Sequence, residues 1–261
     1  MKKLTENQIL FFKVGELPVP SAEIYYMQKF DTWETINFYV FYLNVNGKRI
    51  LINTGVPSNP KNLTKFWEQW DKRCKFVKYL SMQEILNQLG LSPNDIDYVF
   101  VTPLVGYSTG NLDLFNRSKI LFYRGGWVDF WAPNLKRGSF SDLPLEIVME
   151  KNVLCKLVTE QRNNIVLLGD EKINELNAEI KFGGVHHRSS MIIIFNINGK
   201  KIAFTDSIFS LGNYDARTPI GILESIDEAY EVFNKLDKVD VVVPIYDRKL
   251  GDRFPNGVIK L

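Results

Sequence analysis

The sequence has few of the side chains on which metal centres and redox sites depend. Its 261 residues include only two histidines, His186 and His187, which are adjacent, and two cysteines, Cys74 and Cys155. Two cysteines are too few for a disulfide framework or a cysteine-rich metal site, so we expect two free thiols in a reducing cytosol. Any mechanism that needs several imidazoles is excluded by the histidine count.

An excess of one charge and a long apolar run are also lacking. Lysine and arginine total 32 against 30 for aspartate and glutamate, a net charge of +2, which gives no basis for a nucleic-acid-binding face. No stretch approaches the roughly 20 apolar residues of a membrane span, and residues 1–16 lack the apolar run of a secretory signal. We therefore expect a cytoplasmic protein with neither nucleic-acid nor membrane partners.

The composition that remains is typical of a packed globular chain. Hydrophobic residues make up 45% and charged residues 24% of the sequence, which favours a core over disorder. The length suits one large α/β domain or two small ones. Because no linker, low-complexity run or charge block divides the chain, we predict a single domain over residues 1–261.

Two segments predict β-hairpins. Residues 35–55 and 189–207 each contain two apolar runs joined by an Asn-Gly pair, at Asn46-Gly47 and Asn198-Gly199. Asn-Gly favours a two-residue turn because both central residues need positive φ. The segments "LNVNGKRILINTG" and "FNINGKKIAFTDS" also match each other closely, which suggests two related halves.

Helical patterns flank the hairpins. Residues 60–73 carry apolar side chains at helical spacing, and Ser81 and Glu84 form a capping-box pattern before a helix that Gly90 ends. In "ILESIDEAYEVFNKL" we expect one apolar stripe, made of Ile222, Ile226, Tyr230 and Phe233. Strands that follow these helices predict mixed sheets flanked by helices, an α/β (α+β) sandwich. The aromatic segment 123–148 is either an insertion over a cavity or irregular core packing.

At this point five segments resemble, in order and spacing, the metallo-β-lactamase superfamily, and most closely its lactonase-like branch. They are "ILINTG", "IDYVFVTPLVGYSTGN", "GGVHHRSS", "IAFTDS" and "VVVPIYD". The resemblance covers the chain from about residue 35 to its end. It implies an αββα four-layer sandwich and, in the family, two zinc ions held by imidazoles and carboxylates, with a hydroxide between them that attacks a carbonyl or phosphoryl centre.

The sequence departs from the family at most of the ligand positions. In place of the early Asp, the His, His, Asp and His of the loop, and the last His, the chain has Asn53, Pro103, Val105, Tyr107, Ser108 and Tyr246. Only His186 and Asp206 keep ligand-type side chains. Since even a single catalytic zinc normally has three protein ligands, we predict no family-type dinuclear metal site and no cofactor.

His186 and Asp206 are the candidate catalytic residues. An imidazole with a pKa near neutrality suits general acid–base work, and a buried Asp206 carboxylate needs a partner, which Arg188 or His186 would supply. Equally, both residues could be structural remnants of a former site. We expect the side chains of His186 and His187 to point to opposite faces of an extended segment. A serine nucleophile is disfavoured because the sequence has no Gly-x-Ser-x-Gly elbow.

The same strand ends predict a ligand pocket. Its candidate lining residues are Tyr107, Ser108, His187, Arg188, Tyr246 and Asp247. Three interpretations stay open. In the first, the chain is a metal-free relative that binds a small molecule or partner in a remnant cleft. In the second, it is a hydrolase or other enzyme that uses His186 and Asp206 with one weakly held metal or none. In the third, it is a structural subunit that pairs with an active relative. The sequence fixes neither the substrate nor the oligomeric state.

Overall fold

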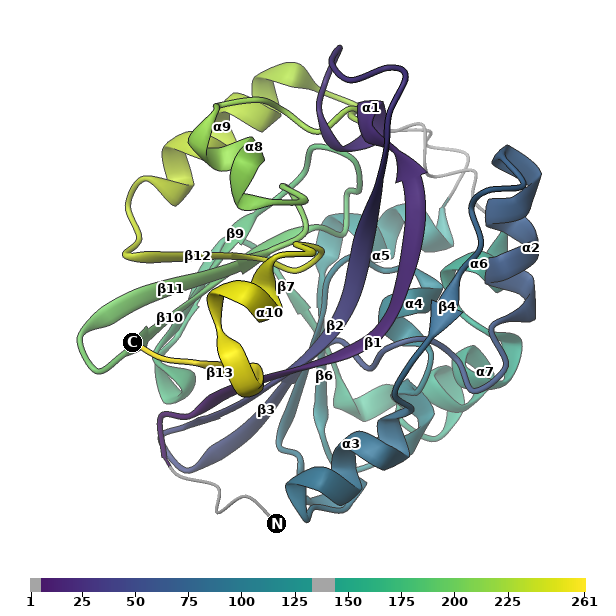
Figure 1. The fold of residues 1–261 in the computed structure, drawn as a ribbon. Coiled ribbons are helices and arrows are strands. Elements are labelled where there is room, and N and C mark those ends of the chain that lie inside the picture. Colours follow the sequence, from purple (N-terminus) through teal and green to yellow (C-terminus); the bar gives the residue numbers. More distant parts are fainter. Residues whose placement is uncertain (1–5, 133–143) are drawn as a thin grey trace.

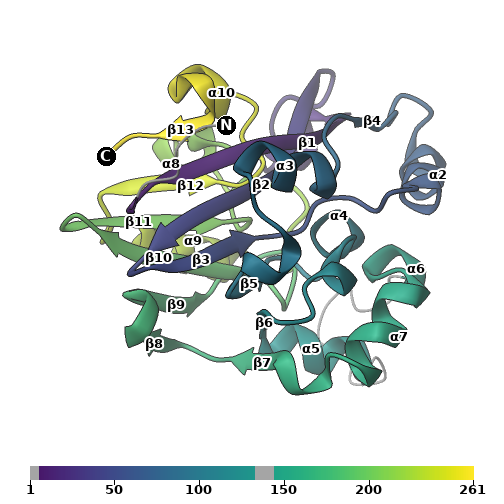
Figure 2. The ribbon, with the colours of Figure 1, turned by 90° about the horizontal axis from the view of Figure 1, so that it is seen from below.

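A computed structural model of the chain describes residues 6–132 and 144–261 (Figure 1). Two β-sheets pack face to face, and helices lie on their outer sides (Figures 1 and 2). Ring contacts join the two sheets directly: Phe41 lies 5.2 Å from Phe204, and Phe100 lies 5.9 Å from Phe195. The predicted α/β sandwich is confirmed.

The first sheet has strand order β13-β1-β2-β3-β5-β6-β7, with β4 paired to β1. Its strands are β1 (Ile9–Pro20), β2 (Trp33–Val45), β3 (Lys48–Ile52), β4 (Val77–Lys78), β5 (Tyr98–Val101), β6 (Lys119–Tyr123), β7 (Ile165–Leu168) and β13 (Val258–Ile259). β3, β5, β6 and β7 run parallel to one another, while β1, β2 and β3 are antiparallel. The long strand β1 was not identified from the sequence.

The second sheet has strand order β12-β11-β10-β9-β8. Its strands are β8 (Glu171–Ile173), β9 (Ala178–Phe182), β10 (Met191–Ile197), β11 (Lys200–Thr205) and β12 (Val241–Pro244). β11 and β12 are parallel and the other pairs are antiparallel. The carboxyl ends of β11 and β12 therefore meet at one edge of this sheet, as those of β3 and β5 do in the first.

Both predicted hairpins are confirmed, one in each sheet. β2 and β3 are joined by Asn46 and Gly47, at φ 52° and 71°, and β10 and β11 by Asn198 and Gly199, at φ 53° and 78°. Positive φ at both central residues is the reason that Asn-Gly occupies these turns.

The helices cover the outer faces of the sheets. They are α1 (Ser21–Ile24), α2 (Lys61–Trp70), α3 (Met82–Leu89), α4 (Gly106–Thr109), α5 (Arg124–Trp131), α6 (Leu145–Val148), α7 (Lys151–Thr159), α8 (Leu211–Asp215), α9 (Ile226–Leu236) and α10 (Leu250–Arg253). Figure 1 shows α8 and α9 beside the second sheet and α2, α3, α6 and α7 beyond the first. The capping box at Ser81 and Glu84 and the left-handed Gly90 are confirmed at the two ends of α3.

The predicted apolar stripe of α9 is wrong. Ile226 and Tyr230 are 39% and 49% exposed, and the helix begins only at Ile226, so Ile222 lies outside it. The buried face consists of Ala229, Val232, Phe233 and Leu236. This i, i+3, i+4, i+7 pattern fits the helical repeat better than the stripe expected from the larger side chains.

Part of the aromatic segment 123–148 lies outside the described residues, namely residues 133–143. The preceding residues form α5, where Trp127 stacks on Phe122 at 4.8 Å. Within the described ranges, no helix is long and apolar enough to cross a membrane.

Candidate functional site

The candidate site lies where strand ends from both sheets meet. Asn53 follows β3, Thr102 follows β5 and Asp206 follows β11. A hydrogen bond of 2.5 Å from Thr102 Oγ1 to Asp206 Oδ1 connects the two sheets at this point. The topology therefore gathers residues that are far apart in the sequence, as expected for the carboxyl ends of parallel strands.

Asn53 has a structural role that depends on its amide. Its Nδ2 donates to Thr102 O at 2.8 Å, and its Oδ1 accepts from Thr102 N at 2.9 Å. The residue adopts φ 65°, a left-handed conformation that asparagine tolerates better than most residues. A carboxylate at this position could accept the second bond but could not donate the first.

The carboxylate of Asp206 is fully buried and held by hydroxyl groups. It accepts hydrogen bonds from Thr102 Oγ1 and Ser190 Oγ. Burial raises the pKa of Asp206 to about 6, although these hydrogen bonds act to lower it. The expected partner Arg188 is not among these donors, and the partner prediction is wrong in that respect.

Hydrogen bonds join the loop that begins at Thr102 to residues 189–191, at the start of β10. Thr102 Oγ1 accepts from Met191 N at 2.9 Å, and Leu104 N donates to Ser189 Oγ at 2.8 Å. Val105 packs into the core instead of carrying a ligand atom. Hydrogen bonds between backbone N–H groups and side-chain hydroxyls thus hold the path of the loop.

The Gly-Asn pair that closes this loop also has a packing role. A Cβ atom on Gly110 would lie 2.2 Å from Pro57 N, so only glycine fits. The Asn111 Nδ2 donates to Thr54 O at 2.7 Å and to Val56 O at 2.9 Å. These contacts give the Gly-Asn pair a structural role at the end of the loop.

An aromatic cavity lies beside Asp206. Its volume is about 70 Å³, and its wall includes Phe38, Trp67, Tyr107, Phe209 and Tyr246. The Tyr246 hydroxyl donates to the Tyr107 hydroxyl at 3.4 Å, and burial raises the pKa of both groups far above neutrality. Both phenols are therefore neutral. We refer to this space below as the aromatic cavity.

Both histidines line the aromatic cavity. Their ring centroids are 4.2 Å apart, so the expectation that they point to opposite faces is wrong. The segment is a turn in which Val185 has φ 72°, not an extended strand. Burial lowers the pKa of His187 to about 3 and lowers that of His186 well below its usual range, so both imidazoles are neutral at pH 7.

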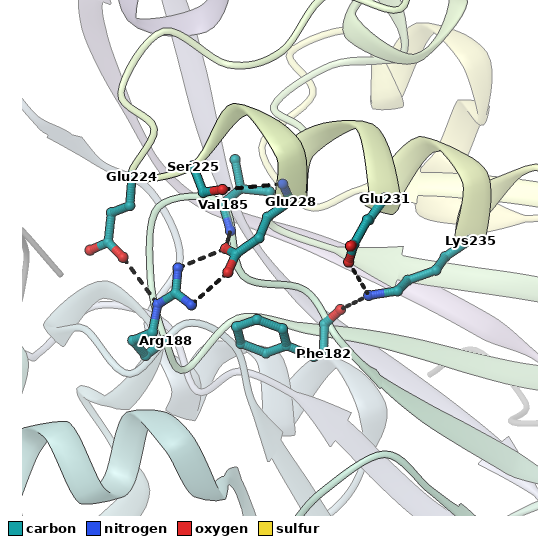
Figure 3. Close-up of polar contacts among 8 residues, drawn as sticks. All are labelled: Phe182, Val185, Arg188, Glu224, Ser225, Glu228, Glu231 and Lys235. Atoms are coloured by element: carbon teal, nitrogen blue, oxygen red, sulfur yellow. Dashed lines mark hydrogen bonds and ion pairs between the residues drawn. The ribbon is translucent and has the colours of Figure 1, made fainter. Parts of the chain in front are cut away.

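Arg188 points toward α9 (Figure 3). Its guanidinium donates to Glu224 at 3.0 Å and to Glu228 at 2.7 and 2.8 Å. Glu228 also accepts from Val185 N at 3.1 Å. Burial acts to raise the pKa of Glu228, but the bonds from Arg188 and Val185 dominate and lower it. Arg188 thus fixes the histidine turn to α9.

Ser108 and Asp247 lie at the edges of the predicted pocket. Ser108 is fully buried, and its Oγ donates weakly to Thr102 O at 3.5 Å. Asp247 accepts from Leu211 N at 3.1 Å and Lys249 N at 2.9 Å, and lines a separate, open hollow of about 590 Å³. Of the predicted pocket residues, the structure therefore brings Tyr107, His187 and Tyr246 into one cavity together with His186.

The residues at this edge do not fit two zinc ions. Over residues 6–132 and 144–261, no group of three or more His, Cys, Asp or Glu side chains is placed to hold a metal ion. Tyr107 and Tyr246 lie close enough to Asp206 that, in addition to burial, its charge raises the pKa of both phenols, and Asp206 already accepts two hydroxyl hydrogen bonds. A dinuclear site would need several further imidazole or carboxylate donors.

Sequence reasoning missed residues that contribute to this site. Phe38 lies on β2 and Trp67 on α2, and their rings stack at 5.7 Å. Glu23 on α1 also lines the aromatic cavity. No local pattern marks these residues, because each joins the site through a segment distant in sequence.

No protein-family model matches the sequence, and no curated protein matches it significantly. The structure is similar to that of an N-acyl homoserine lactone hydrolase with N-hexanoyl-L-homoserine at its metal centre (TM-score 0.71, 13% identity, 98% of this chain and 100% of that one). It is also similar to AidC, a dizinc quorum-quenching lactonase (0.66, 13%, 98% and 90%). A third similar structure is a Thermotoga maritima protein assigned as a metallo-β-lactamase (0.53, 16%, 90% and 95%). The chain therefore has the metallo-β-lactamase fold, as the resemblance implied.

Proposed function

We propose that this chain has lost the family's dinuclear metal site and binds a small molecule in the aromatic cavity, without zinc-dependent hydrolysis. The observation that carries the proposal is the position of the side chains in the loop 102–108. Val105 and Tyr107, which replace family ligands, form part of the cavity wall. Ser108, which replaces a third, is buried against the backbone of Thr102.

The character of the cavity supports binding. Ligand sites are concave and mostly apolar, with a few polar groups that orient the ligand. Here the walls are aromatic, and the Tyr107 hydroxyl and the two neutral imidazoles supply polar atoms. Trp70, at the cavity's edge, is 51% exposed, so a ligand has a route to the interior.

Metal content tests the first half of the proposal. Protein purified without chelator is expected to contain well under one equivalent of zinc, iron or manganese by elemental analysis. Near-stoichiometric metal would contradict the loss of the site. Adding zinc to the purified protein and repeating the measurement after desalting extends the test to a weakly held ion.

Occupancy of the cavity tests the second half. Small apolar and amphipathic compounds that bind there should change the fluorescence of Trp67 and raise the melting temperature. Val105→Phe fills the cavity and should abolish binding, at an overpacking cost of about 1–3 kcal/mol. Unchanged binding in a folded Val105→Phe variant would place the ligand elsewhere.

An enzymatic function that uses His186 and Asp206 is the alternative. The specific observation in its favour is that His186 lies in the cavity wall as a neutral imidazole with nitrogen atoms that a substrate could reach. A hydrolysis screen with lactones, thioesters and phosphodiesters would detect such an activity. Equal rates in the wild type and in His186→Ala and Asp206→Ala would remove these two residues from any mechanism.

A further inference from the structure

Val185 has a backbone conformation that is unfavourable for its side chain. Its φ is 72°, and His186 N donates to Gly184 O at 2.9 Å, so Val185 is the central residue of a three-residue turn closed by an i to i+2 hydrogen bond. A β-branched residue with positive φ is a steric outlier. Such a conformation persists only where the surrounding contacts impose it, and it is typical of segments that switch or clamp a ligand.

Contacts from residues 224–228, which include the first residues of α9, impose this conformation (Figure 3). Val185 N donates to Glu228 Oε2 at 3.1 Å, and Glu224 N donates to Val185 O at 2.6 Å. The Arg188 guanidinium donates to the carboxylates of the same two residues. The side chains of Arg188 and Glu224 are only 20% and 7% exposed, so dissolved salt screens their ion pair little. We refer to these contacts as the α9 clamp.

The base of the turn segment is anchored separately. Gly183 N donates to Ser190 O at 2.9 Å, which joins the two ends of the segment. The pairing of β9 with β10 stops just outside this bond, at Phe182 and Met191. Residues 184–188 can therefore move about their base without breaking the pairing of the two strands.

The segment carries part of the wall of the aromatic cavity. His186 and His187 line this cavity and are almost fully buried. The cavity has a volume of about 70 Å³, whereas an engineered cavity that accommodates benzene has about 150 Å³. A ligand of that size therefore needs part of the wall to move.

We propose that residues 184–188 are a gate of the aromatic cavity, which the α9 clamp holds shut against the strain at Val185. When the clamp releases, Val185 returns to negative φ, and the two histidines move away from the rings, so the cavity enlarges. The open form is a minor state, and a ligand that binds it shifts the population toward it. This proposal rests on the proposed binding function, because it describes how a ligand enters that cavity.

Amide hydrogen exchange of the full chain, followed residue by residue with NMR, measures opening of the gate. In the wild type the amides of Val185 and His186 should exchange at least about ten-fold faster than the buried amides of β10, because local opening costs less than global unfolding. Arg188→Met removes the ionic part of the clamp and should speed exchange at both residues by at least about ten-fold. Arg217→Met is the matched control, because it removes an ion pair with Asp237 at the other end of α9, and it should leave this exchange unchanged.

Two substitutions at Val185 test the strain separately from the clamp. Alanine and glycine both remove the branched side chain, but only glycine accepts positive φ without a steric cost. Exchange at His186 should therefore be at least about three-fold slower in Val185→Gly than in Val185→Ala. Val243, a buried residue of β12 without positive φ, is the control. There the glycine variant should be the less stable of the two in urea denaturation.

The link between the gate and the cavity is tested with p-cresol as the probe, in stopped-flow measurements of tryptophan fluorescence. The observed association rate is proportional to the fraction of open molecules. Arg188→Met should therefore raise this rate by at least about ten-fold, and Arg217→Met should not change it. A circular dichroism spectrum and a melting temperature confirm that each variant is folded.

Each outcome has a distinct meaning. If the amides of Val185 and His186 exchange only together with those of β10, the gate does not open by itself and the proposal is overturned. If Arg188→Met speeds exchange but not the association of p-cresol, the segment does not control entry, and the binding function stands without a gate. If exchange behaves as expected but neither p-cresol nor a series of small alkanols binds, the proposed function is overturned and the opening of the segment stands.

Discussion

Replacing Asp206 by asparagine tests whether this side chain is a charged functional group or a buried acid that lowers the stability of the fold when it ionises. The side chain is fully buried, and Thr102 and Ser190 donate hydroxyl hydrogen bonds to it. Asparagine has the same shape and keeps an acceptor oxygen, and the hydroxyl of Ser190 can turn to accept from the new amide. The substitution therefore removes the charge with little change in packing.

The magnitude follows from the pKa. Burial raises the pKa of Asp206 from an ordinary value of 3.8 to about 6 in the folded protein. Between these values the folded state binds the proton more tightly than the unfolded state does, so the contribution of Asp206 to the free energy of unfolding falls as the pH rises. At 1.36 kcal/mol per pKa unit, the full loss is about 3 kcal/mol, of which about 2.4 kcal/mol falls between pH 4 and pH 7.

Urea denaturation of both proteins at several pH values, followed by tryptophan fluorescence, measures the effect. The free energy of unfolding of Asp206→Asn minus that of the wild type should increase by about 2.4 kcal/mol from pH 4 to pH 7. A constant offset from the amide cancels in this comparison. Asp71→Asn is the control, because Arg73 lowers the pKa of Asp71 to about 2. The free energy of unfolding of this variant minus that of the wild type should change little above pH 4.

Two results would refute the reasoning. If the difference in free energy of unfolding between Asp206→Asn and the wild type does not change with pH, Asp206 is not a desolvated acid. A difference that decreases toward pH 7 would show that the wild type gains from the ionised form, as it would if a bound cation or metal stood beside Asp206. The second result would favour the enzymatic alternative over the metal-free function.

Three further predictions concern the framework of the site. Asn53→Asp replaces the amide by a carboxylate and loses the donor to Thr102 O. It should lower the free energy of unfolding by about 2 kcal/mol or more in urea denaturation, and a neutral effect would contradict the role of the amide. Arg188→Met should cost about 2 kcal/mol and speed amide exchange at residues 184–190, because it removes the bonds to Glu224 and Glu228. Arg217→Met, which removes an exposed ion pair, should have little effect on stability. Gly110→Ala should lower the melting temperature and reduce the free energy of unfolding by about 1–3 kcal/mol, because the new Cβ would approach Pro57 too closely. Gly169→Ala is the control, because its Cβ would meet open space, and it should be tolerated.

Local patterns in the sequence predicted local structure well. The two Asn-Gly turns are correct because the required positive φ at adjacent residues is a property of those residues themselves. The ends of α3 are correct because Ser81, Glu84 and Gly90 act within a few residues of one another. The same reasoning failed for α9, where Tyr230 is large and apolar enough to suggest burial but faces solvent. Which face of a helix is buried depends on the sheet beneath it.

Contacts across the fold were harder to anticipate. Arg188 was expected near Asp206, but it pairs with Glu224, which precedes α9, and with Glu228 on α9, 36 and 40 residues later in the sequence. The rings of His186 and His187 were expected on opposite faces, but the turn at Val185 brings them 4.2 Å apart. In both cases the backbone path of one short segment decided the direction of the side chains.

The sequence by itself determined the fold class and the two hairpins, because residue identity and short spacings carry that information. Only the tertiary structure decided which residues surround Tyr107. It brought Phe38 from β2, Trp67 from α2 and Glu23 from α1 to the loop that holds Tyr107. The physical reason is that a cavity belongs to no single segment. Its size, charge and ring orientations arise when distant strands and helices pack together.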